Sequence, residues 1–185
     1  MGYRQAAVLA SVSFFLGVLF ICLGIDYRVL NQPLTDQVVQ DGIEFYTTFY
    51  NSPPAIKAMM HAVMGVGIFG LVGKLHQWDE SAIFFDGTSL AAFVFAIAVY
   101  LSVGVPASRT LAAPLADESR ADQVEALRVL SAGNTIMIVA LGAVLVLQAG
   151  EEYARRLDAR AAAPAPAQPR SQEAGEDKKE SAKDK

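Results

Sequence analysis

Cysteine is almost absent from this chain, since Cys22 is the single one among 185 residues. One cysteine excludes an intramolecular disulfide and a cysteine-based zinc site. Inside an apolar helix, such a residue usually behaves as a small buried hydrophobe. Basic residues form no cluster interleaved with aromatic residues, and the net charge is only −4, so a nucleic-acid partner is not expected.

Catalytic motifs are lacking as well. The two histidines, His61 and His76, would stand about 22 Å apart on one helix, which is too far to share a metal. No HExxH or GxSxG segment occurs, and Ser11 and Ser13 have no base and acid partners in prospect. We therefore expect no enzyme, no cofactor and no metal site.

Charged residues are missing from four long stretches, and this absence determines the fold class. The stretches contain no Asp, Glu, Lys or Arg and cover residues 6–25, 58–73, 87–105 and 129–149. About 20 residues of helix match a hydrocarbon core about 30 Å thick. Because lipid offers no water to backbone groups, runs of this kind must be helices. We predict an all-α, polytopic membrane protein with spans at about 6–25, 55–75, 85–105 and 129–149.

The second of these stretches is the shortest and is bracketed by two lysines. Lys57 and Lys74 are predicted to extend their side chains to the two interfaces of the membrane. Inside the spans, His61 and Asn134 are expected to be the main polar groups. Unpaired polar groups are costly in lipid, so each of them suggests a function. A hydrogen bond from His61 to a neighbouring helix is the plainer alternative.

Between the first two spans, residues 35–50 have the pattern of an amphipathic helix. At 100° per residue one face collects apolar and aromatic residues, and the other face is acidic and polar. Pro33 and Thr35 give a start signal, and Pro53–Pro54 give a stop signal. An acidic polar face argues against anionic lipid, so we expect the helix to lie at a lumenal interface or on the protein's own spans. It acts either as a spacer or as a surface for a partner.

After residue 149 the composition changes to charged and polar. Residues 151–160 can continue the last helix, but residues 161–169 are rich in Ala and Pro, and the remainder is almost wholly polar. A segment of this kind buries too little apolar surface to become ordered. We assign residues 1–153 to a four-helix transmembrane domain and residues 154–185 to a disordered charged tail. The tail is either solvated or docks cytosolic proteins.

Orientation follows from the basic residues near the span ends. With an even number of spans both termini lie on one side of the membrane. The two sides tie at five Lys and Arg each, and the tail adds five more to the side of the termini. The positive-inside rule then predicts that both termini are cytosolic.

Glycines form a strip on the second span. Gly67, Gly70 and Gly73 recur every third residue, and such small residues allow a second helix to approach closely. The neighbour is either another span of this protein or a helix of a client.

An ordered set of short segments resembles a known family. The set runs from about residue 6 to 153 with similar spacing and comprises 26–27 (DY), 31–34 (NQPL), 45–50 (FYTTFY), His61, 70–74 (GLVGK), 85–90 (FDGTSL), 100–101 (YL) and 147–150 (LQAG). These segments are similar to those of the fungal secretory-component chaperones for amino-acid permeases, the Shr-three family. Residues 111–127 match nothing in that pattern.

The resemblance implies a four-span endoplasmic-reticulum chaperone. Its family binds nascent amino-acid permeases and releases them to COPII vesicles, and its charged tail contacts coat components. Our own candidates for client contact are His61, Gly67, Gly70, Gly73 and Asn134. The candidates for coat docking in the tail are Lys178, Lys179, Lys183 and Lys185.

Two other functions are compatible with four spans. A small oligomeric channel or transporter would need a water-lined polar pathway, and the spans provide few polar residues for it. An accessory subunit of a membrane complex would need a fixed stoichiometric partner.

Overall fold

The computed structural model describes residues 2–76 and 80–162, with the side chains of residues 80–82 left aside. The elements of these ranges are all helices: α1 (Tyr3–Asn31), α2 (Asp36–Tyr50), α3 (Pro54–Leu75), α4 (Glu80–Val99), η1 (Tyr100–Gly104), α5 (Val105–Ala112) and α6 (Arg120–Ala161). Four helical segments are long and apolar enough to cross a membrane. The prediction of an all-α protein with four spans is confirmed.

Prolines and caps decide where these helices begin and end. Gln32 is extended because Pro33 follows it, and α1 therefore ends at Asn31. The Thr35 hydroxyl accepts a hydrogen bond from the Val38 amide at 3.3 Å and so caps α2. Pro54 opens α3, where its missing N–H costs nothing. Ser119 and Asp122 form a capping box at the start of α6.

The third span is continuous from Ile83 to Ala112 but widens at η1, a π-helical turn. Pro106 follows that turn and has no amide hydrogen for the preceding carbonyls. A π turn lets the helix continue past such a residue, and the Ser102 hydroxyl donates to the Ala98 carbonyl at 2.6 Å.

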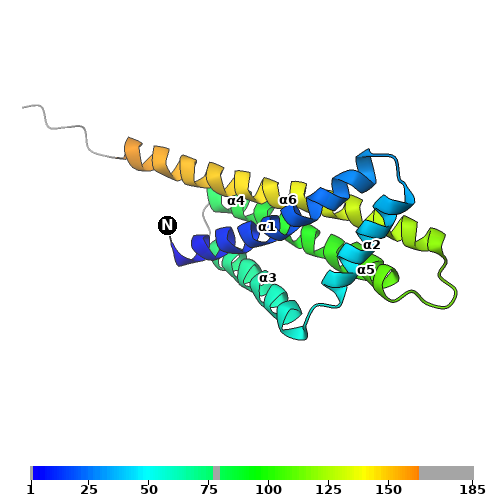
Figure 1. Ribbon diagram of the computed structural model, residues 1–185. Coiled ribbons are helices and arrows are strands. Elements are labelled where there is room, and N and C mark those ends of the chain that lie inside the picture. The colour runs from blue at the N-terminus through cyan, green and yellow to red at the C-terminus, as the bar shows by residue number, and fades with distance from the viewer. Residues whose placement is uncertain (1, 77–79, 163–185) are drawn as a thin grey trace, which may run out of the picture.

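The helices form an antiparallel bundle around α6 (Figure 1). Helices α1 and α4 pack on α6, and α3 packs on α1 and α4. The start of α1 and the ends of α3 and α6 lie at one end of the bundle, which we call the Lys74 end. The loop helix lies at the opposite end, here called the α2 end. One apolar core fills the middle of the bundle, and a second lies under α2.

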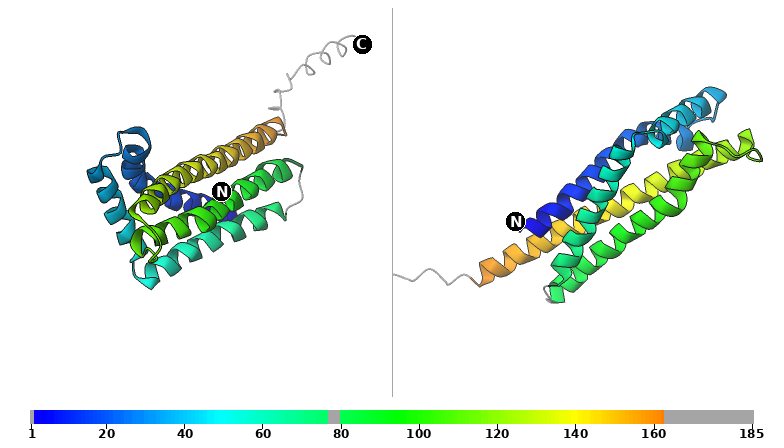
Figure 2. Two further views of the ribbon diagram at one scale, coloured as in Figure 1. Left: turned by 90° about the vertical axis from the view of Figure 1, so that its right-hand side faces the viewer. Right: turned by 90° about the horizontal axis from the view of Figure 1, so that it is seen from below.

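Helix α2 docks on the protein's own helices, which is one of the two positions that its pattern predicts. It contacts α1, α5 and α6, as the views of Figure 2 also show. Its apolar face is buried through Val38, Val39, Ile43 and Tyr46, while Gly42 lies against Leu127 of α6. The predicted amphipathic face is therefore correct, and α5 and α6 supply most of its cover.

The last helix is longer than its predicted span. Helix α6 continues to Ala161, so the change from helix to tail does not fall at residue 153. Ion pairs from Glu152 to Arg155 and to Arg156 support these extra turns. The rest of the predicted tail, residues 163–185, lies outside the described residues.

Candidate functional site

The glycine strip of α3 lies against α1, and Gly67 also faces Phe93 of α4. An added Cβ at Gly67 would be 2.7 Å from a ring carbon of Phe93 and 3.1 Å from Cβ of Ser11, and at Gly70 it would be 2.8 Å from Cγ2 of Val8. At Gly73 an added Cβ would be 3.3 Å from Cδ of Arg4. The Ser11 hydroxyl also donates to the Val63 carbonyl at 2.9 Å. These contacts favour the alternative of packing within the protein, so contact with a client at the strip would require α1 to move.

His61 lies on a part of α3 that has few neighbours. Residues 54–62, the open half of α3, are all exposed except the partly buried Met60. Helices α1 and α3 diverge toward the α2 end (Figure 1), so α1 covers only the other half of α3. An apolar helix that is open around most of its circumference within a membrane has surface available for a further helix.

The hydrogen bond of His61 stays within its own helix. Nδ1 lies 2.7 Å from the Lys57 carbonyl oxygen, and because a carbonyl only accepts, Nδ1 carries the proton. In the neutral ring Nε2 is then an acceptor, with no hydrogen-bond partner among the described residues. The ring also lies 6.1 Å from that of Tyr100. The expected bond from His61 to a neighbouring helix is therefore wrong, and its second nitrogen remains available.

Asn134 belongs to a buried group that we call the polar triad: Asp26 of α1, Tyr46 of α2 and Asn134 of α6. The Tyr46 hydroxyl donates to Oδ1 of Asp26. Nδ2 of Asn134 donates to Oδ2 of Asp26 at 3.0 Å and to the Tyr46 oxygen at 2.8 Å. Asp26 is 0% exposed and Asn134 is 4% exposed, so neither is accessible while α2 is in place. Burial raises the pKa of the Tyr46 hydroxyl, which keeps it a donor.

Asp26 was not among the predicted polar groups of the spans, because the first span was expected to end at residue 25. In the structure α1 continues from residue 26 to Asn31 and carries the Asp26 carboxylate into the bundle. A buried carboxylate is costly unless hydrogen bonded, and the triad supplies these bonds from two other helices. One feature of the sequence could have shown this extension: no proline precedes Pro33, so none interrupts the helix between residue 25 and that point.

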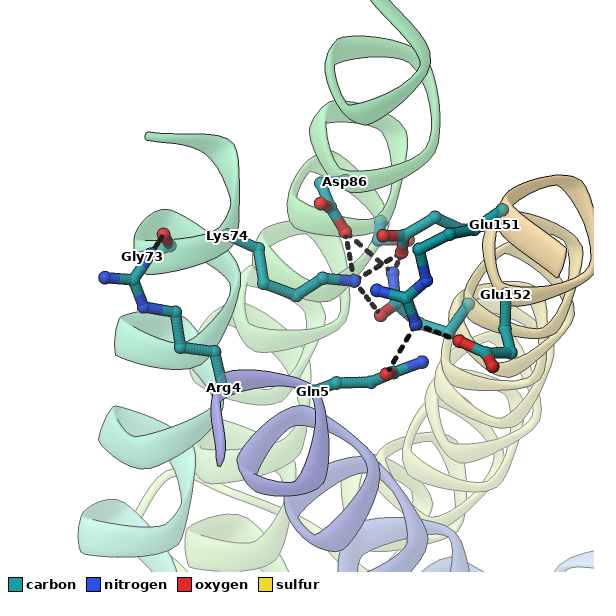
Figure 3. A network of polar contacts seen from close by, with 10 residues as sticks. Arg4, Gln5, Gly73, Lys74, Asp86, Glu151 and Glu152 are labelled. Carbon is teal, nitrogen blue, oxygen red and sulfur yellow. Dashed lines mark hydrogen bonds and ion pairs between the residues drawn. The ribbon is translucent and has the colours of Figure 1, made fainter. Parts of the chain in front are cut away.

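A second polar group, the Lys74 cluster, lies at the other end of the bundle (Figure 3). Nζ of Lys74 is 2.7 Å from Oδ1 of Asp86 on α4 and is also paired with Glu151 on α6. It donates to Oε1 of Gln148 at 2.6 Å, and Gln148 in turn donates to Asp86 at 3.0 Å and to Ser89 at 3.2 Å. The cluster therefore links α3, α4 and α6 at one point.

This position of Lys74 corrects the prediction for its side chain. The ammonium group turns inward, and the residue is 8% exposed. Two carboxylates attract it more strongly than the interface does, because the surroundings are poor in water. Lys57, at the other end of α3, is exposed and lies over the Tyr50 ring at 5.1 Å.

The start of α1 joins this end of the bundle through two arginines. Arg4 donates to the Gly73 carbonyl of α3, and Arg155 of α6 donates to Oε1 of Gln5 at 3.2 Å. Figure 3 shows Arg4 with Gly73, and Gln5, close to Lys74. Helix α3 is thus held by charge and close packing at the Lys74 end and is open at the α2 end.

The structure does not bring all of the predicted site residues together. Asn134 is in the polar triad, His61 is on the open half of α3, and the glycines are between α3 and α1. The predicted coat-docking lysines, Lys178, Lys179, Lys183 and Lys185, lie outside the described residues. Among the described residues no group of His, Cys, Asp and Glu side chains could hold a metal ion.

Comparison with known proteins gives one match. The model of the SHR3 chaperone family, described as ER membrane protein SH3, matches residues 2–185. No curated protein and no solved structure matches the chain.

Proposed function

Because the chain belongs to the SHR3 chaperone family and is thus an endoplasmic-reticulum membrane chaperone, we propose that its clients are amino-acid permeases. It holds them while their bundles are incomplete and then releases them for packaging into COPII vesicles. The observation that carries this proposal is the match over nearly the whole chain, which agrees with the ordered segments that resemble permease chaperones.

The physical need for such a chaperone follows from the bilayer. A nascent transporter exposes polar side chains and broken helices before its own helices have packed, and unpaired polar groups are expensive in lipid. A chaperone for such clients needs membrane-embedded surface that its own fold leaves open. It also needs some hydrogen-bonding groups and an affinity weak enough for release.

The open half of α3 has these properties. Residues 54–62 belong to a helix that is long and apolar enough to cross a membrane, and they are exposed apart from Met60. His61 adds an acceptor, Nε2, that the described part of the protein does not use. We propose that a client helix packs on this half and donates a hydrogen bond to His61.

His61→Leu is expected to lower capture of a co-expressed amino-acid permease about fivefold, since one hydrogen bond in a membrane contributes roughly 1 kcal/mol. The abundance of the chaperone should stay normal, because the imidazole bonds only to its own helix. Capture is measured by cross-linking in isolated membranes. Met59→Leu, an exposed change on the same half, is the matched control. Equal capture by both variants would exclude His61 from the contact.

We also propose that both termini face the cytosol. The support is the even number of spans together with the five Lys and Arg that the tail adds to the side of the termini. A glycosylation acceptor inserted near Asp117, in the loop between α5 and α6, is then expected to be modified. An acceptor inserted after Asp158 should remain unmodified. The measurement is a mobility shift that glycosidase removes, and the reverse pattern would overturn the orientation.

The charged tail is proposed to dock COPII coat components. Under this orientation it extends from α6 into the cytosol, where coat proteins assemble. Its candidate contacts are Lys178, Lys179, Lys183 and Lys185. The support is the family resemblance and the charge of the segment.

A further inference from the structure

A fourth polar group, Ser131, adjoins the polar triad. It precedes Asn134 by one turn of α6 and is 0% exposed. Its hydroxyl faces the Asp26 carboxylate but makes no hydrogen bond of ordinary geometry among the described residues. A hydroxyl can rotate toward Asp26 or toward another acceptor. Helices α1 and α6 therefore carry three polar groups at this point, and α2 contributes one, Tyr46.

A single group of α2 occupies this polar site. The Tyr46 hydroxyl donates to Asp26 and accepts from Asn134, with an N–O distance of 2.8 Å for the second bond. A serine, threonine or tyrosine hydroxyl on another helix would make the same pair of bonds, and an amide would do so as well. These are the groups that an unfinished membrane protein has in excess.

We propose that α2 is a displaceable plug, and that Asp26, Ser131 and Asn134 beneath it bind a hydroxyl or amide side chain on a client's transmembrane helix. This inference rests on the proposed function, since it names the chemistry by which the client is held. It also explains how Asn134, inaccessible in this structure, can contact a client.

The attachment of α2 is compatible with displacement. Short connectors with prolines, Pro33 on one side and Pro53 on the other, join it to α1 and α3. The polar face of α2 makes two contacts with other helices: Arg28 pairs with Asp41 at 2.8 Å, where both side chains are half-buried, and Arg120 donates to Gln40 at 3.3 Å at the surface. Ion pairs that water still reaches contribute little.

The apolar face of α2 has an alternative partner in the membrane. Val38, Val39 and Ile43 are buried against the bundle at its α2 end, and lipid at that level is as apolar as the protein surface they would leave. An amphipathic helix can lie in the interface with its apolar face in lipid. Displacement therefore exchanges protein contacts for lipid contacts and does not expose the apolar face to water.

A reversible disulfide between α2 and α6 tests the plug. An added Cβ at Gly42 would lie 3.4 Å from Cγ of Leu127, close enough for Gly42→Cys and Leu127→Cys to bond in a Cys22→Ala background. The probe is a tagged amino-acid permease co-expressed with the chaperone. Oxidised protein is expected to capture about tenfold less permease than the same protein after reduction by dithiothreitol. Each single-cysteine variant is a control and should show no redox effect.

The outcomes separate the plug from the proposed function. Equal capture before and after reduction, with the disulfide verified by a gel shift, would overturn the plug and leave the chaperone assignment intact. Absence of permease from the reduced protein and from the wild type would count against the permease assignment itself.

A second variant keeps the test independent of the disulfide. Tyr46→Phe removes the hydroxyl that occupies the site, and capture of the permease should rise about threefold, since α2 then leaves more readily. Adding Asn134→Leu should abolish this gain, because the client loses its donor. Unchanged or reduced capture by Tyr46→Phe, at normal abundance, would contradict the plug.

Discussion

Replacement of Lys74 by methionine is expected to destabilise the bundle by about 3–5 kcal/mol, the usual effect of removing one partner from a buried ion pair. Asp86 is 1% exposed and would lose the ammonium that pairs with its carboxylate. Among the described residues, Gln148 would still donate to it at 3.0 Å. The free energy of unfolding of the protein in mild detergent, measured by denaturant titration, tests this expectation.

Lys57→Met is the matched control, because Lys57 is on the same helix but exposed at the opposite end. It should change the unfolding free energy by less than about 1 kcal/mol. Adding Asp86→Asn and Glu151→Gln to Lys74→Met should recover most of the loss, since both uncompensated charges disappear. If Lys74→Met and Lys57→Met have equal effects, the Lys74 cluster does not stabilise the protein.

The number and type of the spans could be predicted because the bilayer sets a simple requirement. A stretch without charge that matches the thickness of the hydrocarbon core must be helical, and four such stretches are present. For α2 the sequence pattern predicted a buried apolar face but left two positions open, a lumenal interface and the protein's own spans. The structure shows the second position, with α2 against α1, α5 and α6.

The polar groups could not be predicted, because their positions depend on which helices are neighbours. Lys74, Asp86 and Glu151 each lie just outside an uncharged stretch, where a charge normally marks the end of a span. Antiparallel packing brings these three ends together, so each charge is paired inside the bundle. Asp26 also lies just outside an uncharged stretch, at the α2 end of the bundle. There its carboxylate is bound by a hydroxyl and an amide donor, and not by a cation.

The glycine strip could be predicted only in part from the sequence. Its spacing predicts a close approach of helices but does not identify the partner. The structure provides α1, whose Val8 and Ser11 lie against Gly70 and Gly67. The role in client contact stays a prediction for these glycines, and a substitution at Gly70 distinguishes it from internal packing.

Gly70→Leu is expected to lower the stability and the abundance of the chaperone together. Even a Cβ at Gly70 would lie 2.8 Å from Cγ2 of Val8 and 3.2 Å from the carbonyl oxygen of Arg4. The carbonyl belongs to the backbone of α1 and cannot rotate away, so the two helices must separate. Overpacking commonly costs about 1–3 kcal/mol, and the larger leucine should reach the top of that range.

Gly65→Leu is the control, because nothing lies within 4 Å of an added Cβ there although Gly65 is on the same helix. The measurements are the thermal midpoint in detergent, abundance in the membrane and cross-linking to a permease. If α1 keeps the strip covered, Gly70→Leu loses abundance and cross-linking in proportion, and Gly65→Leu loses neither. Normal abundance with lost cross-linking would instead show that clients displace α1 from the strip. Normal values for both would mean that close packing at Gly70 contributes nothing, because the bundle would then accept a leucine between two helices that the structure places in contact.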